Sequence, residues 1–185
     1  MQSTVLLING SLRDGSVNAA VLKTLQHVAP DLVITSAYEG MSQLPHFNPD
    51  HDHAPLDLSV ARLRHEIAQA DALMFCTPEY AGGLPGSFKN LLDWTVGGIE
   101  MDQKPVGYIN ASSLSAPTGG EDAYGSLRKV LGYVGARLVE PACLRIPLSR
   151  RDIDPFDIIA DSAIRLKIAS ALAELVNAVV QDSVI

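Results

Sequence analysis

Short aliphatic runs alternate along the chain with longer segments whose apolar residues recur at helical spacing. The aliphatic runs predict buried strands at Val5–Ile8, Leu32–Thr35, Ala72–Cys76, Pro105–Ile109 and Val139–Ile146. The amphipathic segments predict helices at Asn18–Ala29, Leu58–Ala70, Gly86–Thr95, Ala123–Gly135 and Ile158–Val180. Because strands and helices alternate, the pattern predicts an α/β fold with a parallel sheet covered on both faces. Pro141 inside the fifth strand predicts an edge position or a bulge.

The length of the chain fits a single domain. With 185 residues, of which 47% are hydrophobic, it is long enough to build its own core. A loop rich in proline, histidine and aspartate spans Tyr38–Asp57, but no linker, repeat or low-complexity segment divides the sequence. We therefore expect one domain over residues 1–185.

Charge and cysteine usage narrow the range of partners. The net charge of −7 disfavours nucleic acid or an anionic membrane as a general partner, so a bound anion must be captured locally. Cys76 and Cys143 stand far apart in apolar runs, which is typical of buried thiols in a reducing compartment. No basic residue precedes the apolar run at Val5, and no apolar stretch approaches the about 18 residues of a membrane span. These features predict a cytoplasmic protein.

The first strand is followed by a loop suited to a phosphate. Residues 10–18 read GSLRDGSVN and provide a glycine turn, hydroxyl groups, Arg13 and the amino end of a helix. The spacing from Gly10 to Gly15 imitates a P-loop, but the lysine of a P-loop and the G-x-G-x-x-G of dinucleotide folds are both missing. The alternative is that Ser16 or Asn18 only caps the helix and that Arg13 is a solvated charge.

The third strand is followed by a loop suited to a flat ring. Residues 77–86 read TPEYAGGLPG, in which two prolines fix the geometry and three glycines let the backbone approach a ligand. Tyr80 adds an aromatic surface. In a parallel sheet these loops meet outside the carboxyl ends of the strands, where ligands bind. The helix that follows has a simpler interpretation, since its apolar residues are typical of core and Lys89 and Asp93 of a surface pair.

Together, the segments GSLRDGSVN and PEYAGGLPGSFKNLLDW resemble the NAD(P)H-dependent FMN reductases of the flavodoxin-like superfamily, a group that includes quinone, chromate and azo-dye reductases. The resemblance covers roughly residues 4–140, and the second segment is long and specific. It implies a flavodoxin-like three-layer sandwich with a five-stranded parallel sheet of order 2-1-3-4-5. It also implies FMN as cofactor and NADPH or NADH as co-substrate.

The resemblance also assigns the cofactor-binding residues loop by loop. In the first loop, the phosphate and ribityl chain would be held by Ser11, Arg13, Ser16 and Asn18, with Val17 beside them. In the second loop, the isoalloxazine ring would be lined by Thr77, Pro78, Glu79, Tyr80, Ala81 and Gly82. The third loop would contribute Ser112 and Ser113, with Gly119 and Gly120 further along.

Two features depart from the family pattern. The third loop, taken as Asn110–Glu121, is longer than the compact S-x-G-x-x-G-G form. Position 81 holds alanine where many members have asparagine, which removes one possible polar contact.

In the family, NAD(P)H delivers a hydride to flavin N5 and leaves, and a second small molecule then takes the electrons in the same cleft. The cofactor carries this chemistry, so we expect no catalytic acid, base or nucleophile. Family members assemble with the flavin near a subunit interface, which implies a homodimer or homotetramer. Two alternatives stay open: a flavodoxin-type electron carrier, which lacks an arginine in the first loop, and a nucleotide-binding module that does not use flavin.

Two further clusters favour structural roles. His46, His51 and His53 lie near Asp50 and Asp52, a set that could bind Zn²⁺ or Ni²⁺, but a proline-rich loop is a poor scaffold for a metal and the family stretch has no metal role. We therefore expect no metal site. The pair at 150 and 151, both arginine, is typical of a solvated turn, or it could lie near the phosphate of a pyridine nucleotide.

Overall fold

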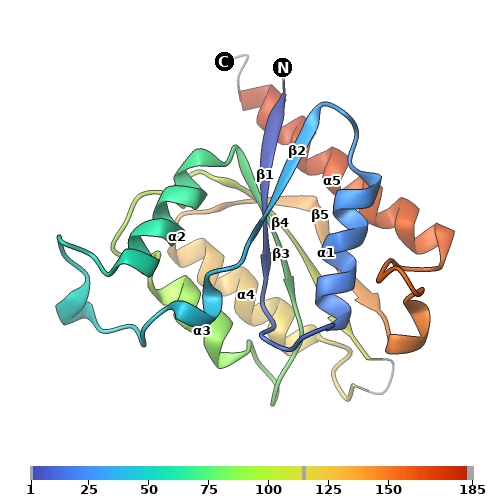
Figure 1. Cartoon of the computed structure of the whole chain (residues 1–185), viewed down its shortest axis with the longest axis horizontal. Coiled ribbons are helices and arrows are strands. Elements are labelled where there is room, and N and C mark those ends of the chain that lie inside the picture. Colours follow the sequence, from blue (N-terminus) through green and yellow to red (C-terminus); the bar gives the residue numbers. More distant parts are fainter. Residues whose placement is uncertain (1, 114–115, 183–185) are drawn as a thin grey trace.

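The computed structural model describes residues 2–113 and 116–182 and shows a parallel sheet between two layers of helices (Figure 1). The strands are β1 (Ser3–Asn9), β2 (Val33–Tyr38), β3 (Ala72–Thr77), β4 (Pro105–Ser112) and β5 (Arg137–Pro147). Their order is β2-β1-β3-β4-β5, and all neighbouring strands run parallel. The fold predicted from the sequence is confirmed.

The helices follow the strands in alternation. They are α1 (Val17–Val28), α2 (Leu58–Gln69), α3 (Gly86–Asp93), α4 (Glu121–Tyr133) and α5 (Ser162–Asp182). Short 3₁₀ turns occur at Met41–Gln43, Pro49–His51 and Arg150–Asp152 (η1, η2 and η3). In the described residues, no helix combines the length and apolar character that a membrane crossing requires.

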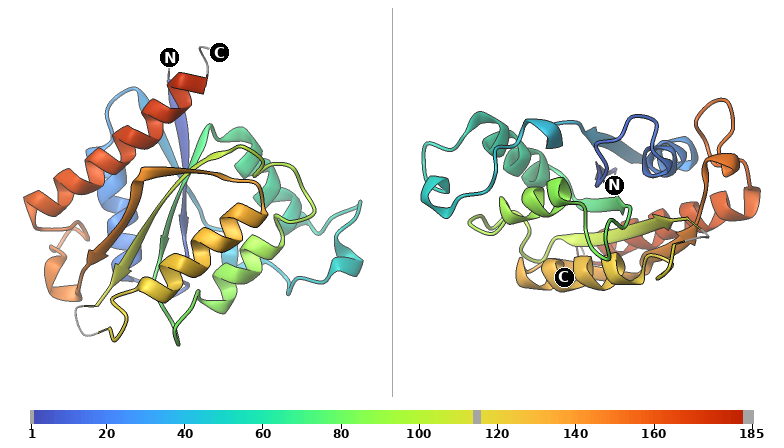
Figure 2. Two further views of the ribbon diagram at one scale, coloured as in Figure 1. Left: turned by 180° about the vertical axis from the view of Figure 1, so that it is seen from behind. Right: turned by 90° about the horizontal axis from the view of Figure 1, so that it is seen from below.

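The two helical layers cover opposite faces of the sheet. Helices α1 and α5 pack on one face, and α2, α3 and α4 on the other (Figure 2). Each face has its own apolar cluster, built around Leu25 and Leu172 on the first face and Phe88 and Leu127 on the second. Because both faces are covered, every residue of β3 and β4 is buried.

Strand β5 forms one edge of the sheet and carries a bulge. Val106 pairs with Leu138 and Tyr108 with Cys143, so the register shifts between these two pairs. Pro141 lies within the shifted stretch, where the absence of its N–H disturbs no regular ladder. Both positions that the sequence offered for this proline, an edge and a bulge, are therefore present.

The last helix begins later than the sequence predicted. Ile158 and Ile159 are not helical, because Ile159 forms an isolated bridge with Ile153 and its amide donates to Thr24 Oγ1 at 3.0 Å. Helix α5 begins at Ser162, after Asp161, whose Oδ1 accepts from the amide of Ala163 at 2.7 Å. The two isoleucines match the apolar spacing of the helix and were therefore predicted as its start. In the structure they belong to a loop that packs beside α1.

The loops after β1, β3 and β4 gather at the carboxyl edge of the sheet, the lower edge in Figure 1. This edge is where strand order reverses between β1 and β3, the place at which such sheets bind ligands.

Candidate functional site

The first loop leaves β1 close to the end of β3. The amide of Gly10 donates to the carbonyl of Cys76 at 2.7 Å. A Cβ at position 10 would lie 2.7 Å from Thr77 Oγ1 and 2.9 Å from the ring of Phe88. Only glycine therefore allows the first loop to start this close to β3 and α3.

Side chains of the first loop organise its own backbone. Asn9 Oδ1 accepts from the amide of Ser11 at 3.0 Å, and Ser11 Oγ accepts from the amide of Arg13 at 3.2 Å. Ser16 Oγ accepts from the amide of Ala19 at 3.1 Å, so the capping role predicted for Ser16 is confirmed. The other amides of the first turn of α1 have no carbonyl partner inside the helix, and with the helix dipole they favour an anion at this loop.

Asn18 is buried in the first turn of α1 and faces β3. Its Oδ1 accepts a hydrogen bond from Cys76 Sγ at 3.3 Å. Burial raises the pKa of the Cys76 thiol far above its ordinary value, so the thiol keeps its proton and remains the donor. The thiol thus fixes the orientation of the Asn18 amide at the start of the helix.

The second loop contains a tight turn. Tyr80 and Gly83 exchange backbone hydrogen bonds of 3.0 and 3.1 Å. Between them, Ala81 and Gly82 both have positive φ angles, 50° and 73°, as a type I′ turn requires. The Tyr80 side chain is 52% exposed, so the turn presents an aromatic surface at the rim of the sheet.

The Glu79 side chain connects the second loop to the third. Its Oε2 accepts from the amide of Ala123 at 2.9 Å, and its Oε1 accepts from the hydroxyl of Thr118. Burial alone would raise the pKa of Glu79, but the hydrogen bonds from Thr118, Ala123 and Asp122 outweigh it and hold that pKa below its ordinary value. Glu79 is therefore an anionic cap for the first turn of α4.

The third loop is shorter than the sequence predicted. Strand β4 continues through Ser112 and α4 begins at Glu121, so both ends of the expected loop belong to regular elements. Ser112 Oγ donates to the carbonyl of Gly119 at 2.9 Å and holds the loop against the end of the strand. Residues 114–115 of the expected loop lie outside the described residues.

Asn110 and Gly120 are in close contact at the base of the third loop. Asn110 is fully buried, and its Nδ2 donates to the carbonyl of Thr77 at 3.0 Å. Among the described residues its Oδ1 has no hydrogen-bond partner. A Cβ on Gly120 would lie 1.7 Å from that oxygen, and Gly120 has a φ of 83°, so glycine is required there on both counts.

A cavity of about 280 Å³ lies where the three loops meet. It is lined by Ser11, Arg13, Gly15, Ser16, Val17, Asn18, Pro78, Tyr80, Ala111, Ser113, Leu148, Ser149 and Arg150. Eight of the residues predicted to bind a cofactor are in this set, and they come from all three loops.

The other predicted residues do not line this cavity in the described part of the chain. They are Thr77, Glu79, Ala81, Gly82 and Ser112. Thr77 is fully buried beneath the second loop, where its hydroxyl donates to the carbonyl of Pro78 at 3.0 Å. Ser112 lines an adjoining cavity of about 350 Å³ together with Ser113, Gly119, Arg145 and Pro147. Ser113 therefore lies between the two cavities.

The segment after β5 also lines the cavity, and the sequence predicted of it only that the arginine pair is a solvated turn or lies near the phosphate of a pyridine nucleotide. Leu148, Ser149 and Arg150 line the cavity, and Arg150 Nη1 donates to the carbonyl of Gly15 in the first loop. Arg150 and Arg151 are both exposed, as expected of a solvated turn, and Arg150 in addition contacts the first loop. This contact joins positions 135 residues apart, and no local motif indicates it.

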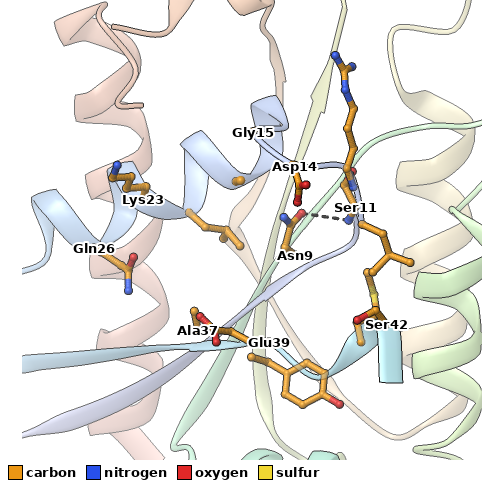
Figure 3. Close-up of a pocket in the computed structure, with 15 residues that line it drawn as sticks. Asn9, Ser11, Asp14, Gly15, Lys23, Gln26, Ala37, Glu39 and Ser42 are labelled. Atoms are coloured by element: carbon orange, nitrogen blue, oxygen red, sulfur yellow. Dashed lines mark hydrogen bonds between the residues drawn. The ribbon is translucent and has the colours of Figure 1, made fainter. Parts of the chain in front are cut away.

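A larger cavity of about 440 Å³ lies along another side of the first loop (Figure 3). Its lining comes from β1, the first loop, α1 and the segment around the end of β2, and includes Asn9, Lys23, Glu39 and Ser42. Among the described residues, none from the second or third loop lines this larger cavity. Its position away from those loops distinguishes it from the cavity where the three loops meet.

The histidine- and aspartate-rich segment has a structural use. Asp52 Oδ1 pairs with Arg64 Nη2 at 2.6 Å, and both side chains are about nine-tenths buried. Arg64 Nε also donates to the carbonyl of Trp94 at 2.9 Å, which ties the loop to the end of α3. Within residues 2–113 and 116–182, no group of three or more His, Cys, Asp or Glu side chains is placed to hold a metal ion.

Comparison with known proteins gives consistent matches. Residues 3–148 match the family model described as NADPH-dependent FMN reductase. A quinone reductase of Escherichia coli is 30% identical over 154 residues, which is 82% of this chain and 81% of the relative. An NAD(P)H-dependent FMN reductase of Pseudomonas aeruginosa is 38% identical over 112 residues, or 59% of this chain and 60% of the relative.

A solved structure extends the similarity over most of the fold. FerB, a flavoenzyme NAD(P)H:(acceptor) oxidoreductase from Paracoccus denitrificans, superposes with a TM-score of 0.79 at 26% identity. The superposition covers 94% of this chain and 95% of that one. The similarity therefore includes the part of the chain beyond residue 148, where the family model ends.

Proposed function

Because the chain belongs to the NADPH-dependent FMN reductase family, we propose that it passes electrons from NAD(P)H through FMN to a small-molecule acceptor such as a quinone, a flavin or an azo compound. It is an oxidoreductase with FMN as cofactor and NAD(P)H as co-substrate. The observation that carries the proposal is the cavity at the meeting point of the three loops, because it brings Arg13 and the first turn of α1 together with Pro78 and Tyr80.

The residues present fit the phosphate end of FMN. Arg13, the Ser11 hydroxyl and the first turn of α1 supply positive charge and donors on one side of the cavity. Ser16 and Val17 contribute backbone amides there, and the orientation of Asn18 is fixed by Cys76. We assign these residues to the phosphate and the neighbouring ribityl chain.

The second and third loops fit the ring end. Pro78 and Tyr80 supply the wall, while Ala81 and Gly82 form a turn with little side chain above it. A wall of this kind leaves one ring face open, which a nicotinamide needs in order to stack. We assign Ser112 and Ser113 to the opposite end of the ring. Thr77 and Glu79 are assigned to holding the second loop in position.

When bound, FMN would supply the redox chemistry between the nicotinamide and the acceptor. The chain itself binds and orients. Arg13 and the first turn of α1 fix the phosphate, and the turn at Tyr80 sets the height of the rim. Glu79, already occupied by Thr118 and Ala123, holds the third loop against the second. Because the cofactor carries the chemistry, we expect no side chain to act as acid, base or nucleophile.

The two substrates use one open face in turn, which predicts ping-pong kinetics. Steady-state rates with varied NAD(P)H and quinone are expected to give parallel double-reciprocal lines. Intersecting lines would contradict the shared face. No reduction by either NADH or NADPH, with reduction by a separate reductase protein instead, would move the chain to the class of flavodoxin-type carriers.

We further propose a cytoplasmic homodimer or homotetramer, for two separate reasons. The exposed aromatic ring of Tyr80 at the cavity rim suits a subunit interface. Both cysteines are free and buried, as is usual for a protein of a reducing compartment. Sedimentation velocity is expected to show a dimer or a multiple of it, and an active monomer would contradict the assembly.

A further inference from the structure

Arg150 lies at the cavity but outside the part of the chain that defines the family. The family model ends at residue 148, and η3, which carries Arg150, begins two residues later. The guanidinium nevertheless reaches back to the first loop, where Nη1 donates to the carbonyl of Gly15. An added Cβ on Gly15 would lie 3.1 Å from that nitrogen, so the two residues are in direct contact.

The segment that carries Arg150 is held in place by several hydrogen bonds. Ser149 and Asp152 form a capping box, in which the Ser149 amide donates to Asp152 Oδ2 at 2.7 Å. Further along, the amide of Ile159 donates to the buried hydroxyl of Thr24 on α1 at 3.0 Å, and Lys23 pairs with Asp157 at 3.5 Å. The segment is therefore fixed to the same helix whose first turn faces the cavity.

We propose that Arg150 is a second phosphate-binding guanidinium for FMN, which acts together with Arg13; this inference rests on the proposed function. Both arginines line the same cavity, together with Ser11 and Ser16. A guanidinium has five N–H donors, and the contact with Gly15 uses a single N–H group. The remaining donors are available to phosphate oxygens.

The negative net charge of the chain opposes the binding of a phosphate, so a second arginine at the cavity is useful. The protein carries a net charge of −7, which repels a phosphate dianion, and Asp14 lies in the same loop. Arg13 and the amino end of α1 oppose that repulsion, and a second guanidinium adds to them. Because Arg150 lies in the segment after β5, FMN affinity is then expected to depend on the correct position of that segment.

The test is a titration of the purified protein with FMN and with riboflavin, which lacks the phosphate. For Arg150→Ala the affinity for FMN is expected to fall by about tenfold, with the affinity for riboflavin unchanged within about twofold. Arg150→Lys is expected to recover only part of the loss, because an ammonium lacks the planar fork. Arg151→Ala is the matched control, since Arg151 is exposed in the same turn, and it is expected to bind both ligands as the wild type does.

Each other outcome overturns the inference in a recognisable way. Unchanged FMN affinity in Arg150→Ala shows that Arg150 does not bind the phosphate, while the proposed function stands. An equal loss of affinity for FMN and for riboflavin in Arg150→Ala shows that the substitution disturbs the first loop as a whole. An effect confined to the KM of NADPH, with NADH and FMN unchanged, assigns Arg150 to the co-substrate. Absence of FMN binding by the wild type overturns the proposed function as well.

Discussion

The Glu79 carboxylate accepts a hydrogen bond from the backbone amide of Ala123 at 2.9 Å, which joins the loop after β3 to the first turn of α4. The same carboxylate accepts from the hydroxyl of Thr118. The resemblance assigned Glu79 to the lining of the flavin ring. In the structure its carboxylate accepts hydrogen bonds from Thr118 and Ala123. Glu79 therefore helps to set the relative position of two of the three loops, together with the hydrogen bond from Asn110 to the carbonyl of Thr77.

Replacing Glu79 is expected to destabilise the fold. Glu79→Ala removes the acceptor for the first turn of α4, and the loss of such a cap lowers the free energy of unfolding by about 1 kcal/mol. Thermal unfolding measures it. Glu174→Ala, which removes an exposed carboxylate on α5, is the control and is expected to leave the melting temperature unchanged. Equal melting temperatures of the two variants would contradict the capping role.

The contribution of Glu79 is expected to depend on pH. Its pKa in the folded state lies below the ordinary value of 4.5, so folding favours the ionised form. The stabilisation is present above pH 4.5 and is lost as the pH falls through the folded-state pKa. The difference in stability between wild type and Glu79→Ala is therefore expected to shrink below pH 4.5. A difference that stays constant down to acid unfolding would show that the carboxylate charge plays no part.

Alanine substitutions at Gly120 and at Gly125 are expected to change the free energy of unfolding in opposite directions. Gly120→Ala places a Cβ 1.7 Å from Asn110 Oδ1 at a φ of 83°, and such a clash destabilises by about 2 kcal/mol or more. Gly125 lies in α4 with no atom within 4 Å of an added Cβ, so Gly125→Ala stabilises by about 0.5–1 kcal/mol. Urea unfolding measures both, and the same sign for the two variants would contradict this account of the third loop.

The turn at residue 81 holds an unfavourable backbone angle. Ala81 has a φ of 50°, a region that asparagine tolerates better than alanine. Ala81→Asn is expected to raise the free energy of unfolding by about 0.5–1 kcal/mol. The control is Ala160→Asn, an exposed position with no positive φ, where no gain is expected. A gain at both positions would point to a cause other than the turn.

Local patterns were sufficient to predict the strands and a parallel sheet, whereas the order of the sheet and the residues of the cavity came from the resemblance to a known family. Aliphatic runs marked every strand, and two continuous motifs placed Ser11, Arg13 and Pro78 where the structure has them at one cavity. The start of α5 was predicted wrongly because apolar residues at helical spacing can also belong to a buried loop. Ile158 and Ile159 continued the apolar spacing of α5, but they belong to a loop bridged to Ile153.

Residues that depend on long-range contacts could not be predicted. Arg150 contacts Gly15 across 135 positions of the sequence, and nothing near Arg150 in the sequence distinguishes it from Arg151. The direction of the Glu79 side chain is a similar case, because its partners are Thr118 and Ala123 on the next loop. A motif identifies which residues are present, whereas their partners are set by the packing of the three loops.

The central claim is that this chain transfers electrons from NAD(P)H to a small molecule through FMN, and an anaerobic visible spectrum tests it most directly. The protein loaded with FMN, at about one per chain, is expected to lose its flavin colour on addition of NADH or NADPH alone. Addition of a quinone is then expected to restore the colour. A flavin that stays oxidised with saturating amounts of both nucleotides would contradict the assignment.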